Sequence, residues 1–229
     1  MKEPSFYGAL NIASQNCTLF MPRLPNEYKI WCGDIHPPAD FKLSYAVDDV
    51  LYLEDMSAWL TDHLSEMGDS GKLYLIDGVN SDSGSRATPA SFEGLEQLKE
   101  KQKVDYTTLF DILSNCRVIK SAYEIDVMRY CAYVASNAHV EVMRSAKDCS
   151  IEYELEAKFL YEIYRNGGCR RCAYTSICAC GPNSAVLHYG HAGAPNDRPL
   201  LSTDMALLDM GAEYHGYVSD ITCSVSVTI

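Results

Sequence analysis

The chain has 229 residues, of which 47% are hydrophobic and 22% charged, which is the composition of a folded protein large enough to bury a core. Its 19 Lys and Arg against 31 Asp and Glu give a net charge of −12, which argues against nucleic acid or an anionic membrane as a partner. No run of about 18 apolar residues and no secretory signal is present, so we expect a cytoplasmic protein with reduced cysteines.

The first half of the chain is predicted to mix strands and helices. Two short β-type runs, residues 6–12 and 17–22, are separated by the turn signal "ASQN". Apolar residues recur at helical spacing over 56–67, and Gly68 ends that pattern. Residues 72–78 read as a strand, followed by a polar, turn-rich loop.

A second region begins near Arg117 with long helical patterns. Ser121 and Glu124 form a capping box at the start of the first helix, and a second helix runs over 151–166 up to a Gly-Gly stop. Strand patterns then follow in "AYTSICAC", "SAVLHYG", "MALLDMG" and "YVSDITCSVSVTI". The order predicts an α+β fold, with an α/β N-terminal part, and domains at 1–117 and 118–229.

Two aspartates stand inside these strand-like runs, although aspartate is a poor strand former. Asp209 and Asp220 are symmetric about the midpoint between Tyr214 and His215, so a hairpin with "EYHG" as its loop would set them directly opposite each other. Directly opposed Cβ atoms lie about 4.5–5.5 Å apart, where like charges repel. In an apolar setting such a pair would share a proton or hold a cation. The alternative is that one aspartate is a turn residue on an exposed edge.

Two histidines lie at the end of the second of these strand patterns, "SAVLHYG", or just after it. His188 closes an apolar run, and His191 lies between Gly190 and Gly193. Either histidine could ligate a metal, act as an acid or base, or bind a substrate carbonyl. The alternative is a hydrogen-bonded structural role.

Four cysteines in the pattern C-x2-C-x5-C-x-C indicate a competing metal site as an alternative. These are Cys169, Cys172, Cys178 and Cys180, which could hold zinc or act as a redox site. The central spacing is short, since about 15 residues usually separate the two pairs of a zinc ribbon. Buried, unreactive thiols are the alternative.

The motifs "SAVLHYGHAGAPNDRPL" and "MALLDMGAEYHGYVSDITCS" resemble those of the prolidases, the Xaa-Pro dipeptidases of the pita-bread metallopeptidase family. "RVIKSAYEIDVMR" is similar to the linker and first catalytic-domain helix of that family, and "AVDDVLYL" and "GVNSDSGS" to its N-terminal domain. The resemblance implies a partial creatinase-like N-terminal domain followed by the first half of a pita-bread catalytic domain. It also implies two divalent metal ions, usually Mn²⁺, and hydrolysis of dipeptides with C-terminal proline or hydroxyproline.

The resemblance also implies roles for single residues. Asp209 matches an aspartate that ligates one metal, and Asp220 matches one that bridges both. His188 matches a histidine that contacts substrate near the scissile bond, and Tyr174 matches a tyrosine beside the metal-bound hydroxide. Members of the family are commonly homodimeric.

One part of the family pattern is missing. The family site needs a histidine and two glutamates after the aspartate pair, whereas no histidine follows His215 and the only acidic residue after Glu213 is Asp220. We therefore expect an interior portion of a prolidase-like protein that lacks three metal ligands and is inactive alone. The alternative is a non-catalytic interaction module with this fold, although such modules usually lose their metal-ligating residues by substitution.

Overall fold

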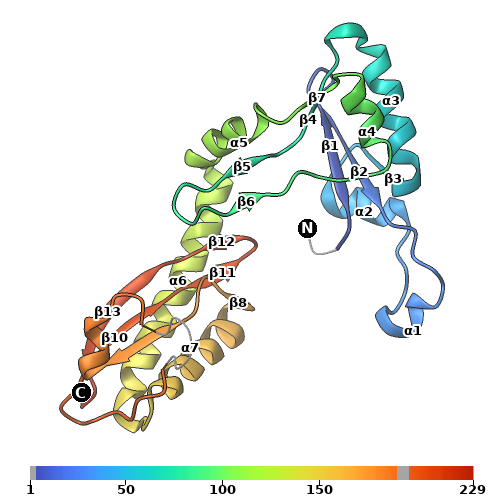
Figure 1. Ribbon diagram of the computed structural model, residues 1–229. Coiled ribbons are helices and arrows are strands. Elements are labelled where there is room, and N and C mark those ends of the chain that lie inside the picture. The colour runs from blue at the N-terminus through green and yellow to red at the C-terminus, as the bar shows by residue number, and fades with distance from the viewer. Residues whose placement is uncertain (1–3, 190–195, 229) are drawn as a thin grey trace. The chain divides into compact units, whose positions relative to one another are not determined.

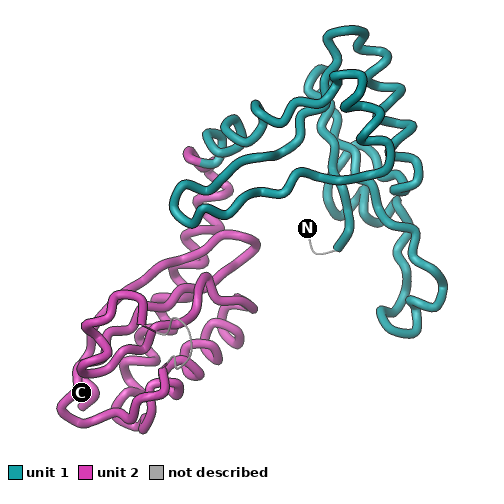
Figure 2. Tube along the Cα trace, in the orientation of Figure 1, with its two compact units in different colours: residues 1–117 teal, residues 118–229 magenta. Residues whose placement is uncertain are grey.

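The computed structural model describes residues 4–189 and 196–228. The chain divides into two units, an N-terminal unit of residues 1–117 and a C-terminal unit of residues 118–229, drawn in teal and magenta in Figure 2. Helices and strands are mixed in both units, which confirms the α+β prediction. Within the described ranges, no helix is both long and apolar enough to cross a lipid bilayer.

A three-stranded sheet organises the N-terminal unit. Strands β1 (Tyr7–Asn11) and β2 (Asn16–Met21) form the expected antiparallel hairpin, and β3 (Asp49–Tyr52) lies parallel to β2. Helix α3 (Met56–Glu66) confirms the apolar spacing, because its buried Leu60 and Leu64 pack in one cluster with Phe20 of β2. Burying such apolar side chains contributes roughly 1.5–3 kcal/mol each.

The rest of this unit is built from shorter elements. The predicted strand over 72–78 is short, since β4 covers only Leu73–Tyr74, where it pairs with β7 (Val104–Asp105). The polar loop after it holds a small hairpin of β5 (Gly78–Val79) and β6 (Arg86–Ala87). The remaining elements are α1 (Tyr28–Cys32), α2 (Pro38–Tyr45), η1 (Leu53–Asp55), η2 (Gly68–Ser70), α4 (Leu95–Glu100) and α5 (Leu109–Val118).

Two long helices form the base of the C-terminal unit. Helix α6 (Ala122–Ser145) begins with the predicted capping box of Ser121 and Glu124. After η3 (Ala146–Asp148), α7 (Glu152–Gly167) runs to Gly168, which adopts the left-handed conformation that favours glycine. Figure 1 shows α6 and α7 packed together against the strands of this unit.

Six strands pack against those helices and form two three-stranded sheets. One sheet has the order β13-β10-β9 and the other β12-β11-β8. Their bounds are β8 (Arg171–Cys172), β9 (Ile177–Cys180), β10 (Met205–Met210), β11 (Ala212–Tyr214), β12 (Tyr217–Val218) and β13 (Ile221–Ser226). The strand predicted at "SAVLHYG" is wrong over its described residues, 184–189, since these belong to the 3₁₀ helix η4 (Gly181–Ala185), which includes a proline, and to a turn after it.

Candidate metal centre

The hairpin that carries the aspartates turns one residue later than the sequence spacing predicts. Tyr214 pairs with Tyr217, so the loop consists of His215 and Gly216 alone, with φ of 49° and 83°. Two successive residues with positive φ are typical of a type I′ turn, which suits the twist of a tight hairpin. The prediction of directly opposed aspartates is therefore wrong: Asp209 pairs with Thr222 instead.

The corrected register makes the aspartates diagonal neighbours. Asp220 precedes Thr222 by two residues, so it lies on the same face of the hairpin as Asp209. That face points away from the helices, because Leu208 and Met210 fill the inner face of β10. Asp209 is half-buried and Asp220 exposed, so the pair stands on an open face and the predicted apolar setting is wrong for Asp220.

The β-ladder is interrupted next to the pair. Pairing of β10 with β13 ends at Met210 and Ile221 and resumes between β11 and β12. Gly211 lies in the interruption, where an added Cβ would come within 1.9 Å of the Ser219 carbonyl oxygen. Only glycine fits so close a backbone approach. This close contact sets the path of the chain between the two aspartates.

Tyr174 joins the pair from the segment between β8 and β9. Its hydroxyl lies 2.5 Å from Asp209 Oδ1 and 2.9 Å from Asp220 Oδ1. The adjacent Ala173 donates its amide to the Gly211 carbonyl, which holds this segment against the interruption. Burial, followed by the two carboxylates, raises the pKa of Tyr174 well above its ordinary value. The phenol therefore stays protonated and donates.

The single phenolic hydrogen of Tyr174 does not balance the negative charge of the two carboxylates. A hydroxyl has a single hydrogen, so it can donate fully to only one of the two carboxylates at a time. Among the described residues, no Lys, Arg or His forms an ion pair with Asp209 or Asp220. Carboxylate oxygens are ligands that hard divalent cations prefer. The pair thus fits a divalent cation as part of a donor set, although the described residues gather no group of three metal-ligating side chains.

The structure places His188 on an exposed turn after η4. The neighbouring Tyr189 donates its hydroxyl to Glu152 Oε2 at 2.7 Å, and the amide of Arg198 donates to the same oxygen at 3.1 Å. These contacts fix the chain on both sides of residues 190–195. The histidine candidate His191 and the turn glycines Gly190 and Gly193 lie outside the described residues.

Glu152 is an important residue that the sequence reasoning missed. It is fully buried, and its other oxygen accepts from the amide of Cys180 and from Asn183. A signal was available, since Glu152 falls on the same helical face as Leu155 and Phe159, both fully buried. An acidic residue on an apolar helix face indicates a buried hydrogen-bond acceptor.

The four cysteines do not form the competing metal site. All ten cysteines of the chain are free thiols, and the described residues, which include all four candidates, form no group of three metal-ligating side chains. Cys178 contacts Met210, whereas Cys169 packs beside Cys131. Burial raises the pKa of Cys180 to about 12 and that of Cys169 to about 11. These thiols are therefore protonated core residues.

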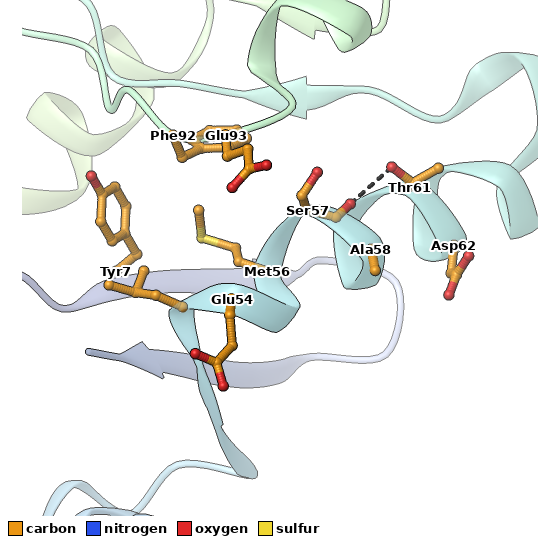
Figure 3. Close-up of a pocket in the computed structure, with 10 residues that line it drawn as sticks. Tyr7, Glu54, Met56, Ser57, Ala58, Thr61, Asp62, Phe92 and Glu93 are labelled. Carbon is orange, nitrogen blue, oxygen red and sulfur yellow. Dashed lines mark hydrogen bonds between the residues drawn. The ribbon is translucent and has the colours of Figure 1, made fainter. Parts of the chain in front are cut away.

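The N-terminal unit has a groove of about 730 Å³ along α3. Figure 3 shows Met56 and Phe92 at its centre and the carboxylates of Glu54, Asp62 and Glu93 around it. Those three acidic residues are exposed. Exposed carboxylates are ordinary surface groups, so this groove gives no indication of chemistry.

Comparison with known proteins finds a family match in each unit. Residues 126–228 match the model of metallopeptidase family M24, and residues 1–74 match that of the aminopeptidase P N-terminal domain. The chain is 46% identical over 222 residues to the Xaa-Pro dipeptidase of Homo sapiens, covering 97% of this chain and 43% of that protein. The chain thus spans less than half the length of this relative.

Solved structures show the same architecture. Pseudomonas aeruginosa aminopeptidase PepP superposes with a TM-score of 0.75 at 28% identity, over 98% of this chain and 50% of that one. Zinc-substituted Escherichia coli aminopeptidase P, in complex with product, gives a TM-score of 0.73 at 23% identity, over 99% and 51% of the two chains. Asp209 and Asp220 lie inside the segment, residues 126–228, that matches metallopeptidase family M24, and the chain as a whole is a relative of the Xaa-Pro dipeptidases.

Proposed function

We propose that this chain carries part of the active site of a dinuclear metallopeptidase that hydrolyses dipeptides with C-terminal proline or hydroxyproline. The observation that carries the proposal is the contact of one tyrosine hydroxyl with two carboxylates on an open sheet face. The similarity to Xaa-Pro dipeptidases supports the substrate class. Divalent ions, with Mn²⁺ as the proposed metal, would supply an activated water and polarise the peptide carbonyl.

Each residue has a proposed part in binding. Asp209 and Asp220 would hold the cations, with Asp220, the more exposed of the two, placed between them. Tyr174 would orient the carboxylates through its hydroxyl, which lies within hydrogen-bond distance of both. His188 would contact the substrate from its exposed turn. Proline's tertiary amide and fixed ring call for a dedicated pocket, which further residues would have to complete.

Two carboxylates alone make an incomplete donor set. We therefore propose that this chain by itself binds a second metal ion weakly or not at all and cleaves Xaa-Pro dipeptides poorly. Its ten free thiols support a reducing, cytoplasmic location. The family relationship favours a homodimer. The two retained aspartates and their tyrosine disfavour a non-catalytic interaction module.

The proposal is tested by assaying the purified chain with Gly-Pro and Mn²⁺ beside the double variant Asp209→Ala/Asp220→Ala. We expect slow hydrolysis that disappears in the variant. Turnover at about 10 s⁻¹, ordinary for an enzyme, would contradict the incomplete site. Equal rates in both proteins would contradict the assignment of the aspartates. Bound zinc that survives the double change would instead indicate a site at the cysteines.

A further inference from the structure

We propose that His139 is a positioning residue for Asp209 and Asp220. Its ring joins β10 and β13 on the core side of the sheet and so holds the two aspartates at the spacing that a divalent cation requires. The inference rests on the proposed function of Asp209 and Asp220. It concerns a side chain on the opposite side of the sheet, in the core formed with α6 and α7.

The imidazole of His139 is buried and makes a hydrogen bond from each ring nitrogen. Its Nε2 lies 3.0 Å from the carbonyl oxygen of Met210, and its Nδ1 lies 3.3 Å from Sγ of Cys223. Because a carbonyl oxygen can only accept, Nε2 carries the proton and donates it. Nδ1 then accepts from the Cys223 thiol. Burial lowers the pKa of His139, against the opposing effects of the Met210 bond and the Asp209 charge, and a neutral ring fits both contacts.

Both contacts fall close to the aspartates, one on β10 and the other on β13. Met210 directly follows Asp209 in β10, and Cys223 follows Asp220 by three residues in the neighbouring strand. Leu208 pairs with Cys223, and the next two pairs along β10 are the last before the ladder is interrupted. One ring therefore connects the two strands at the end of their regular pairing.

This connection matters because regular pairing does not extend to Asp220. The β10–β13 ladder stops at Ile221, so Asp220 lies in the interruption opposite Gly211. Tyr174 contacts both carboxylates on the outer side, and His139 holds the backbones from the inner side. Without the ring, the spacing of the two strands beside Asp220 would rest on the last ladder pair, Met210 with Ile221, and on the hydrogen bonds between Ala212 and Ser219 beyond the interruption.

The ring itself is held by rigid elements. His139 projects from α6, and its ring packs edge-on against Phe159 of α7, with 5.3 Å between centroids and an interplanar angle of 67°. Groups held by packed helices are positioned more precisely than groups on loops. Residues that orient metal ligands from outside the ligand shell typically change metal affinity about 10- to 100-fold when replaced.

The test is a Mn²⁺ titration of the full chain and three variants by isothermal calorimetry, with unfolding midpoints measured in parallel. His139→Phe keeps a ring but removes both hydrogen bonds, so we expect Mn²⁺ affinity to fall about tenfold. His139→Gln keeps a donor that can reach the Met210 carbonyl and should restore most of that affinity. Val142→Ala is the matched control, since Val142 is fully buried on the same helix and contacts neither aspartate strand through a hydrogen bond.

Each outcome decides the proposal. Equal Mn²⁺ affinity in wild type and His139→Phe would overturn it while leaving the proposed function intact. An equal loss in Val142→Ala would also overturn it, because the effect would then come from general destabilisation. If His139→Phe does not fold, Cys223→Ala replaces it, and unchanged affinity in that variant overturns the proposal. Failure of the wild type to bind Mn²⁺ would instead refute the proposed function, and this inference with it.

Discussion

Asp220 lies diagonally across from Asp209, because Asp209 pairs with the residue two positions beyond Asp220 in the neighbouring strand. Diagonal neighbours are separated by about 7–8 Å at Cα, farther than directly opposed residues. The diagonal arrangement leaves room for the Tyr174 hydroxyl to reach both carboxylates. The same space between the two carboxylates would accommodate a cation.

The tight turn predicts how the hairpin responds to substitution at His215. His215 has a φ of 49°, which a β-branched residue adopts poorly. We expect His215→Val to lower the free energy of unfolding by about 1 kcal/mol, and His215→Asn to leave it unchanged or raise it. Urea unfolding of both variants checks this. Equal stability of the Val and Asn variants would contradict the type I′ assignment.

The close approach at Gly211 predicts a loss of stability on adding one methyl group. Gly211→Ala would place Cβ against the Ser219 backbone, which has little freedom to move, at an expected cost of about 1–3 kcal/mol. Gly8→Ala is a matched control, because its Cβ would meet Leu19 at an ordinary 3.6 Å. Thermal unfolding of both variants gives the comparison. A Gly211→Ala protein as stable as Gly8→Ala would show that the hairpin can separate at this point.

Removing the shared hydroxyl should destabilise the metal-free protein. In Tyr174→Phe the two carboxylates lose their common donor, and a hydrogen bond to a charged group contributes about 1.5–3 kcal/mol. Because Asp220 is exposed to water, we expect a loss near 1 kcal/mol in urea unfolding without metal. Tyr153→Phe, on the exposed surface of α7, is the control. Equal stability of the two variants would mean that Tyr174 contributes nothing to holding the pair.

The lowered pKa of Glu124 predicts that part of the free energy of unfolding is lost at acid pH. The hydroxyl of Tyr217, followed by the amide and hydroxyl of Ser121, lowers the pKa of Glu124 from its ordinary 4.5 to about 2. A lowered pKa in the folded state means that this contribution is present above about pH 4.5 and is lost as the pH falls toward 2. Glu124→Gln should therefore flatten the stability profile between those values. Parallel profiles for wild type and variant would refute this.

Local features of the fold could be predicted from the sequence, while contacts between distant segments could not. The capping box of Ser121 and Glu124 and the hairpin of β1 and β2 were predicted because their signals lie within a few residues. The predicted register of the hairpin at His215 is wrong by one residue, because a histidine in the sequence does not indicate a positive φ. The contact of His139 with Met210 joins residues 71 apart in sequence, for which one sequence contains no local pattern.

The central claim is that Asp209 and Asp220 together hold a divalent cation. The most direct measurement is Mn²⁺ binding to the purified chain by isothermal calorimetry, compared with Asp209→Asn, Asp220→Asn and the control Asp126→Asn on the exposed start of α6. We predict that the wild type and Asp126→Asn bind Mn²⁺ alike and that each change in the pair weakens binding at least tenfold. Mn²⁺ binding that is equal in all four proteins would contradict the claim.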